Sequence, residues 1–278
     1  MTKKALLISF FALLYLNRLI AFDLSVPIGG RSAGMGRTAA CSQNIWAIFN
    51  NPAGIASVQD ISLGFYYENT WMLKTTSYKS GAFVIPISKG ALGVSVSQFG
   101  YSSYNENRFG LAYARAFGPY IQLGLQLDYL MLSYGNDYGR HHAVTFDIGL
   151  QSQLTDRLRL GVNAFNPARI DFRDLPDNSL STTLRLGLAY TLIKDFTAEI
   201  DIEKNTLQEG VNLRAGVEYI LFGCFAMRAG VESNPGIFTF GAGYEISFLQ
   251  VNIATRMHPV LGASLQAGLI FSLHKNKS

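Results

Sequence analysis

The sequence predicts an all-β protein, an antiparallel transmembrane β-barrel of about fourteen strands with a small N-terminal plug. From residue 181 to 273, short segments alternate strictly between apolar and polar side chains, and a tight turn separates each from the next. A strand places successive side chains on opposite faces, so each segment has one apolar and one polar face. Only 15% of the residues are charged, whereas 27 glycines, 14 tyrosines and 19 phenylalanines are present. This composition and alternation are typical of a barrel with a lipid-facing surface.

Residues 1–21 have the pattern of a secretory signal peptide. Lys3 and Lys4 precede an apolar stretch over residues 5–16, which is too short to span a bilayer comfortably. Ala21 is the expected last residue before the cleavage site. We therefore expect export, and a final location in the outer membrane of a Gram-negative-type bacterium.

Residues 22–60 do not have the strand pattern and are the expected plug. Irregular backbone cannot face lipid, because its polar groups would lack hydrogen-bond partners there. We therefore expect this segment to fold into the periplasmic mouth of the lumen. Its glycine-rich stretch and its Asn-Pro-Ala-Gly stretch give the predicted plug residues Gly34, Met35, Gly36, Asn51, Pro52, Ala53 and Gly54.

Residues 61–273 are predicted to form the transmembrane barrel, followed by a tail over residues 274–278. An even strand number is expected of single-chain bacterial barrels. The predicted strands are residues 61–68, 78–87, 91–98, 108–117, 120–134, 142–154, 158–165, 182–193, 196–203, 211–221, 225–232, 237–246, 248–256 and 261–273.

Very short connections alternate with a set of connections that are generally longer and more polar. Outer-membrane barrels show this asymmetry, with short turns on the periplasmic side and longer loops outside. A soluble β-sandwich has no reason for it. The expected longer loops are residues 69–77, 100–107, 135–141, 167–181 and 204–210.

The polar face of the predicted strands carries charges of both signs, and it also carries a glycine in nearly every strand. Unpaired charges in a narrow interior are costly, so we expect Arg214 to lie beside Glu199 and Asp201, and Arg228 to lie between Glu218 and Glu245. The inward glycines either permit strand curvature alone or leave room for a plug. The predicted lumen charge network comprises Arg185, Glu199, Asp201, Arg214, Glu218, Arg228 and Glu245.

Catalytic, cofactor and metal sites have no signature in this chain. His141 and His142 lie near acidic residues in sequence, but no serine or carboxylate stands at a recognised catalytic spacing. No metal-ligand spacing and no phosphate-binding glycine loop occurs. Cys41 and Cys224 lie in very different segments, so no disulfide is predicted. The net charge of +4 comes without a basic aromatic patch, which argues against nucleic-acid binding.

Two stretches of the expected plug resemble a known signature. "RSAGMGR", followed by an alanine at residue 39, and "WAIFNNPAGIA" over residues 46–56 are similar to the N-terminal signature of the long-chain fatty-acid transporter (FadL) superfamily, and closest to its PorV/PorQ branch. The resemblance implies that the N-terminal segment plugs a fourteen-stranded barrel and that the seven plug residues named above help to form the plug. The chain departs from true fatty-acid transporters in its short outer loops, and from the superfamily in its charged C-terminal tail.

These observations leave two main hypotheses of function, neither of them enzymatic. The first is a PorV/PorQ-like accessory barrel of the type IX secretion pathway, with secreted proteins or secretion-machinery components as partners. The alternative is a FadL-like transporter whose hydrophobic ligand leaves sideways through the wall, where Gly81 and Gly100 would mark a kink. A structural barrel without a transport role is the third. Outer-membrane lipid is an expected partner in each case.

Overall fold

The computed structural model describes residues 24–273, except residues 74, 136–138, 174 and 176–179. The predicted signal peptide and C-terminal tail lie outside the described residues. Within the described part, no helix is long and apolar enough to cross a bilayer.

Nearly all of the regular structure is strand. Short helices occur before the first strand and after it: α2 (Gly30–Gly34), α3 (Ala47–Asn50), η1 (Pro52–Ser57) and η2 (Thr70–Met72). The strands are β1 (Ile61–Asn69), β2 (Ser77–Ile87), β3 (Gly90–Tyr101), β4 (Tyr104–Phe117), β5 (Ile121–Tyr134), β6 (Arg140–Gln153), β7 (Leu158–Phe165), β8 (Thr183–Ile193), β9 (Phe196–Asn205), β10 (Asn212–Leu221), β11 (Phe225–Glu232), β12 (Ile237–Ile246), β13 (Leu249–His258) and β14 (Gly262–Leu273).

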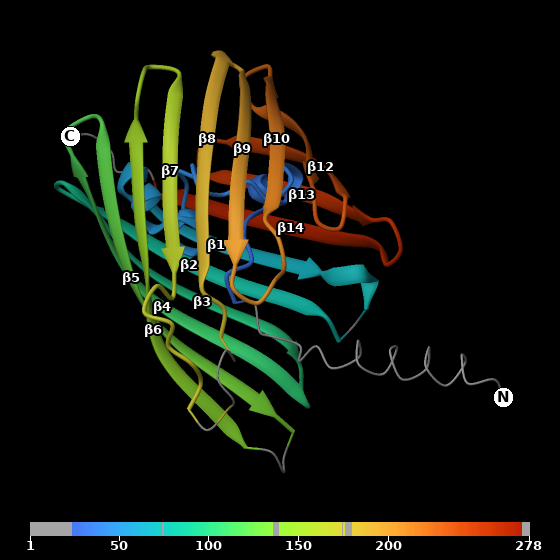
Figure 1. Ribbon diagram of the computed structural model, residues 1–278. Coiled ribbons are helices and arrows are strands. Elements are labelled where there is room, and N and C mark those ends of the chain that lie inside the picture. The colour runs from blue at the N-terminus through green and yellow to red at the C-terminus, as the bar shows by residue number, and fades with distance from the viewer. Residues whose placement is uncertain (1–23, 74, 136–138, 174, 176–179, 274–278) are drawn as a thin grey trace.

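The fourteen described strands form a closed antiparallel barrel, which confirms the predicted fold (Figure 1). Each strand pairs with its neighbours in sequence, and β1 closes the barrel on β14, with Ile61 opposite Leu273 and Asn69 opposite Leu265. The tight turns after β2, β4, β6, β8, β10 and β12 all lie at one end, here named the short-turn end. The opposite end, which includes the connection between β7 and β8, is named the long-loop end.

One expected long loop is instead strand. Residues 100–107 were predicted as a loop, but β3 and β4 pair as far as Tyr101 and Tyr104, so the turn holds only two residues. The reason is that the polar run 105–108 belongs to a wall whose inner face is polar. Glu106 and Arg108 are buried inside the barrel, and their polarity is therefore compatible with a strand.

The outward face of the wall is apolar. On β5, Leu123, Leu125 and Leu127 are 42%, 53% and 55% exposed, whereas the intervening Gln126 and Asp128 are fully buried. The same alternation continues on the other strands. Exposed leucine, isoleucine and phenylalanine on every side of a barrel are typical of contact with lipid.

The expected kink in the early strands is absent from the described wall. β2 pairs with β3, and β3 with β4, without a break through Gly81 and Gly100. Gly100 instead has φ of +100° next to the two-residue turn, a conformation that side chains with a Cβ rarely adopt. The strand pairs of the wall therefore have no gap at Gly81 or Gly100. The one register shift in the barrel's strand pairs lies between β8 and β9, at Thr191 and Ile193.

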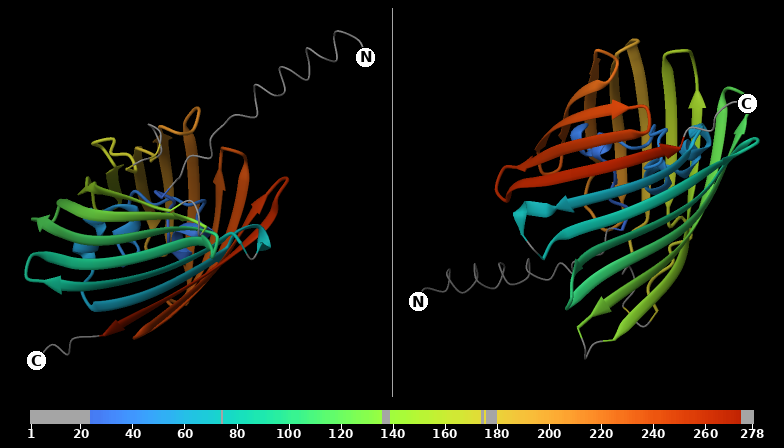
Figure 2. Two further views of the ribbon diagram at one scale, coloured as in Figure 1. Left: turned by 90° about the horizontal axis from the view of Figure 1, so that it is seen from below. Right: turned by 180° about the vertical axis from the view of Figure 1, so that it is seen from behind.

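The described part of the N-terminal segment, residues 24–60, lies inside the ring of strands (Figure 2, dark blue). It approaches the wall on several sides of the barrel. An added Cβ on Gly230 of β11 would lie 2.1 Å from the amide nitrogen of Gly36, and one on Gly124 of β5 would lie 2.3 Å from that of Ala53. These wall glycines therefore permit backbone-to-backbone contact with the segment.

This close contact predicts that Gly230→Ala destabilises the protein, because the added methyl group would overlap the backbone of Gly36. We expect a loss of about 1–3 kcal/mol, seen as a lower temperature at which the heat-modifiable gel band shifts. Gly81→Ala is the matched control, since its Cβ would come no closer than 3.5 Å to its neighbours. Equal stability of the two variants would contradict the packing argument.

Candidate functional site

Arg31 lies between two strands of the wall and joins them to the N-terminal segment. Its guanidinium contacts Glu199 of β9 and Glu218 of β10, each at 2.9 Å. Glu218 also accepts a hydrogen bond from Arg228 of β11 at 2.5 Å. Burial alone lowers the pKa of Arg31, but the two carboxylates outweigh burial and raise that pKa above its ordinary value. The contacts thus bind Arg31 firmly in its charged form.

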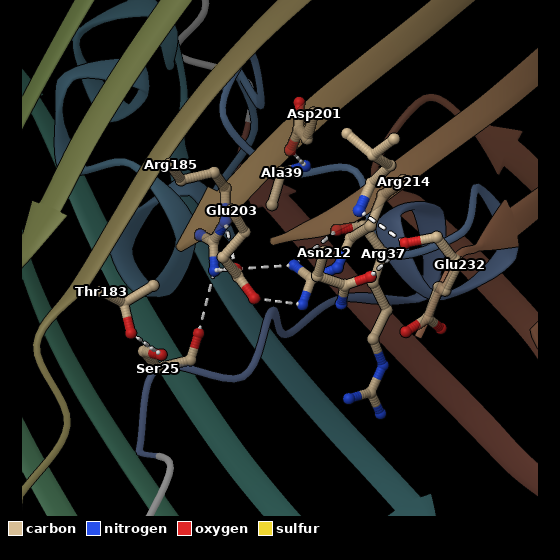
Figure 3. Close-up of polar contacts among 12 residues, drawn as sticks. Ser25, Arg37, Ala39, Thr183, Arg185, Asp201, Glu203, Asn212, Arg214 and Glu232 are labelled. Atoms are coloured by element: carbon tan, nitrogen blue, oxygen red, sulfur yellow. Dashed lines mark hydrogen bonds and ion pairs between the residues drawn. The ribbon is translucent and has the colours of Figure 1, made fainter. Parts of the chain in front are cut away.

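A second buried group centres on Glu203 (Figure 3). Alternation along β9 directs Glu199, Asp201 and Glu203 to the same inner face. Glu203 contacts Arg185 of β8 and Arg214 of β10, each at 2.5 Å. Arg185 also donates to the carbonyl oxygens of Ser25 and Asn50 at 3.1 Å. The network therefore includes the N-terminal segment as well as the wall.

Asp201 has a different partner from the one expected. Its Oδ2 accepts hydrogen bonds from the backbone amides of Ala39 at 2.6 Å and Ala40 at 3.0 Å (Figure 3). Arg214 was expected beside Glu199 and Asp201. It does lie opposite Asp201 in the register of β9 and β10, but its ion pair is with Glu203, and Glu199 pairs with Arg31. The reason is that the N-terminal segment, which supplies Arg31 and two free amides, lies over this part of β9.

Glu245 does not join this buried network. It is exposed near the end of β12, where Gln250 donates to it at 3.4 Å. Arg228 was expected between Glu218 and Glu245. It does contact Glu218, but in place of Glu245 its second partner is the Asn252 side-chain oxygen, which accepts from Arg228 at 2.7 Å. The position of Glu245 next to the short-turn end allows water to solvate its charge.

Two further arginines were missed from the sequence. Arg37 of the N-terminal segment contacts Glu68 of β1 at 2.5 Å. Arg108 of β4 contacts Asp128 at 2.8 Å and donates to the carbonyl of Leu24 at 3.2 Å. The sequence did contain a signal for additional arginines inside the barrel. The inward acids of the predicted strands outnumber the inward arginines, so further cations are needed to balance their charge.

The predicted plug residues lie in two groups inside the barrel. Gly34, Met35 and Gly36 form the first, and Met35 is fully buried. Gly36 has φ of +64° and donates from its amide to the Thr239 hydroxyl at 2.7 Å. Thr239 in turn donates to the Gly34 carbonyl at 3.0 Å. These bonds fix the first group against β12.

Asn51, Pro52, Ala53 and Gly54 form the second group, at the start of η1. The Asn51 side-chain amide donates to the Ala40 carbonyl at 2.7 Å and to the carbonyls of Leu150 and Val162, each at 3.2 Å. Its oxygen accepts from the Ala53 amide at 3.2 Å, which caps η1. Asn51 therefore joins two parts of the segment to the wall.

The histidines and cysteines make local contacts. His142 stacks on Tyr129 with ring centroids 5.7 Å apart, and His141 contacts the Arg173 carbonyl at 3.1 Å. Cys41 and Cys224 are both free. Burial raises the pKa of the Cys41 thiol well above its usual range. The described residues contain no cluster of three or more side chains suited to a metal ion.

The inner surface at the long-loop end is apolar next to β5 and β6, whereas elsewhere at this end it carries polar side chains such as Glu68, Asn205 and Glu232. Leu130 and Leu132 of β5 are completely buried, and Phe172 and Leu180, in the β7–β8 connection, cover them. Phe165 at the end of β7 packs in the same cluster, and the Arg108 guanidinium lies 4.8 Å from its ring centre. We name this set the apolar cluster; it comprises Leu24, Leu130, Leu132, Ala143, Phe165, Phe172 and Leu180.

The wall beside the apolar cluster is irregular. β6 is fourteen residues long, but β7 pairs only with its second half, starting where Asp147 faces Phe165. In Figure 1, β5 and β6 project well below β7 and β8. The free edge of β6 instead receives two backbone bonds from residues 166–182, from Asn166 to Phe146 at 3.0 Å and from Arg173 to His142 at 3.2 Å. We name this junction the β6 seam.

Asn166 holds the β6 seam together. It has φ of +50° and is fully buried. Its side-chain oxygen accepts from the Thr145 hydroxyl at 2.8 Å and from the Ile170 amide at 2.9 Å. Its side-chain nitrogen donates to the carbonyls of Ile170 at 2.9 Å and Ser181 at 3.3 Å. One side chain thus shapes the connection that replaces strand pairing here.

Comparison with known proteins identifies the fold. No protein-family model and no curated protein matches this chain, but solved structures do. The CymD monoaromatic hydrocarbon channel has a TM-score of 0.67 at 14% identity, over 92% of this chain and 100% of that one. The Pseudomonas putida toluene transporter TodX has a TM-score of 0.64 at 14% identity, over 91% of this chain and 99% of that one. A Pseudomonas aeruginosa FadL homologue has a TM-score of 0.59 at 13% identity, over 88% and 96% of the two chains. The chain therefore has the fold of these outer-membrane barrels.

The contacts of Arg31 predict that Arg31→Gln loosens the N-terminal segment, because it leaves Glu199 and Glu218 buried without that cation. We expect a loss of about 3–5 kcal/mol. In a Cys224→Ser background, Cys41, which is 2% exposed, should react faster with a maleimide. Arg115→Gln, at an exposed position on β4, is the control. Unchanged Cys41 reactivity in Arg31→Gln would show that Arg31 does not hold the segment.

Proposed function

We propose that this chain is an outer-membrane transporter that captures small hydrophobic molecules at the long-loop end. The apolar cluster is the observation that carries this proposal. Its side chains gather leucine and phenylalanine on the inner wall, beside buried ion pairs such as Arg108 with Asp128. The second buried apolar cluster, around Trp46, is packed between the N-terminal segment and the wall. Apolar surface inside a barrel binds hydrophobic molecules by removing them from water. The hydrocarbon channels and toluene transporters among the similar structures support the same substrate class.

From the apolar cluster, the hydrophobic ligand leaves through the wall of the barrel rather than along the lumen. A hydrocarbon passing down the barrel would have to separate buried ion pairs such as Arg185 with Glu203, which is strongly unfavourable. Strand pairing is interrupted at the β6 seam, where two backbone bonds from Asn166 and Arg173 reach β6 among the described residues. We therefore propose that ligand leaves sideways at the β6 seam into the lipid, while residues 22–60 act as a plug that keeps the middle of the lumen closed.

The transport proposal predicts that purified protein retains a hydrophobic molecule, and that Phe172→Ala weakens toluene binding and uptake. Burial of a phenylalanine side chain contributes about 1.5–3 kcal/mol, so we expect about tenfold weaker binding or more. Phe238→Ala, on the outward face of β12, is the matched control because Phe238 is 59% exposed. Native mass spectrometry and uptake by cells expressing each variant give the readouts. Ligand-free protein with unchanged uptake would contradict the proposal.

A second candidate is a PorV/PorQ-like accessory barrel that handles secreted proteins. The observation that favours it is the N-terminal segment, which carries the "AGMG" and "NPAG" stretches and is joined to the wall by Arg31, Arg37 and Asp201. A closed interior of this kind suits a scaffold as well as a channel.

Deletion of the gene separates the two candidates. An accessory barrel predicts that the deletion strain loses secreted proteins from its medium and keeps normal growth on hydrophobic substrates. A transporter predicts the reverse. An unchanged secretome, measured by mass spectrometry of the culture medium, would rule out the accessory role.

A further inference from the structure

A polar cavity of about 300 Å³ lies at the short-turn end of the barrel, away from the apolar cluster. The N-terminal segment forms one side of it, and β6 to β9 with the β6–β7 turn form the other. Its lining is rich in arginine, amide and hydroxyl groups. The transport proposal does not use this cavity.

Arg159 of β7 is the unusual residue in this lining. Its Nε donates to the Gln153 side-chain oxygen at 3.1 Å, and its Nη1 donates to the Cys41 carbonyl at 3.3 Å. Among the described residues, no carboxylate forms an ion pair with it, in contrast to Arg31 and Arg185. Arg159 is only half-buried, and its Nη2 makes no hydrogen bond with the described residues. The guanidinium therefore keeps a donor and a full charge for another molecule.

A second cation lines the same cavity. Arg157 is exposed in the β6–β7 turn and has no ion-pair partner among the described residues. Two acids also line it. Glu199 accepts from Arg31 through Oε1, while its Oε2 has no hydrogen-bond partner among the described residues, and Asp156 forms no ion pair with either arginine of the turn region. The three arginines of the lining, which include Arg31, outnumber these two acids. Two unpaired arginines that face one small cavity favour an anion there.

We propose that this cavity binds the oxyanion group, carboxylate or phosphate, of a small soluble molecule that arrives from the short-turn side, with Arg159 as its principal ligand. The planar guanidinium matches both oxyanions and forms charge-assisted hydrogen bonds with them. The side-chain amides of Gln43 and Asn44 supply further donors in the same lining. Because Arg159 also holds the Cys41 carbonyl, the bound anion shares this guanidinium with the N-terminal segment.

The test is binding of succinate and of inorganic phosphate to the purified full-length barrel, in a neutral detergent at low salt, by isothermal titration calorimetry. We expect saturable binding of at least one of them, weakened about tenfold or more by Arg159→Gln and reduced by added salt. Arg115→Gln is the matched control, since Arg115 lies at the same end of the barrel on the outward face and contacts Phe117. Heat-modifiable migration checks that each variant is folded.

A second measurement uses the unmodified protein in case Arg159→Gln fails to fold. Phenylglyoxal reacts with accessible arginines, and bound succinate or phosphate should protect Arg159 from it, as read by peptide mass spectrometry. Protection by succinate alone would assign a carboxylate ligand, and protection by phosphate alone a phosphate ligand. No saturable binding and no protection with either anion would overturn the proposal, as would equal affinity in Arg159→Gln. Neither readout depends on hydrophobic transport, so this proposal and the transport proposal can fail separately.

Discussion

The need to compensate buried charge inside the barrel governs the rest of this structure. The inner face of the wall carries more acids than arginines, and the N-terminal segment supplies what the strands lack. Arg31 and Arg37 add cations, and the amides of Ala39 and Ala40 donate to Asp201. A buried charge without a partner would cost several kcal/mol. The wall and the segment therefore depend on each other, and the wall glycines permit the close approach that these contacts require.

This dependence divides the interior into regions of different chemistry. The middle is filled by ion pairs, by backbone contacts and by a second buried apolar cluster, in which Trp46, Ile48 and Phe49 of the N-terminal segment pack against the wall. At the long-loop end, Leu130, Leu132 and Phe172 create an apolar surface. At the short-turn end, Arg157 and Arg159 line a polar cavity. We infer that the two ends take different ligands, because a molecule suited to one surface is poorly solvated at the other.

The sequence was sufficient to predict the barrel, because lipid on one side and polar groups on the other impose alternation on every strand. It failed where polarity alone suggested a loop, as in residues 100–107, since a strand facing a polar interior can carry Glu106. It also failed on the partners of Glu199 and Asp201. Strand register gives the neighbours of a side chain within the wall, but nothing in the pattern states how the N-terminal segment crosses the lumen. The use of backbone amides by Asp201 has no side-chain signature at all.

The same reasoning applies to the β6 seam, where strand pairing is interrupted. A strand edge without partners is unfavourable in lipid, because each free carbonyl or amide loses its hydrogen bonds to water. A paired strand would satisfy the first half of β6 completely, but β7 ends at Phe165, opposite Asp147, and does not reach it. Asn166 compensates by holding the described residues after β7 against this edge, where it donates from its amide to the Phe146 carbonyl and accepts from the Thr145 hydroxyl. The apolar cluster borders this interruption of strand pairing. A ligand held by the apolar cluster is thus already next to the part of the wall where the proposed sideways exit lies.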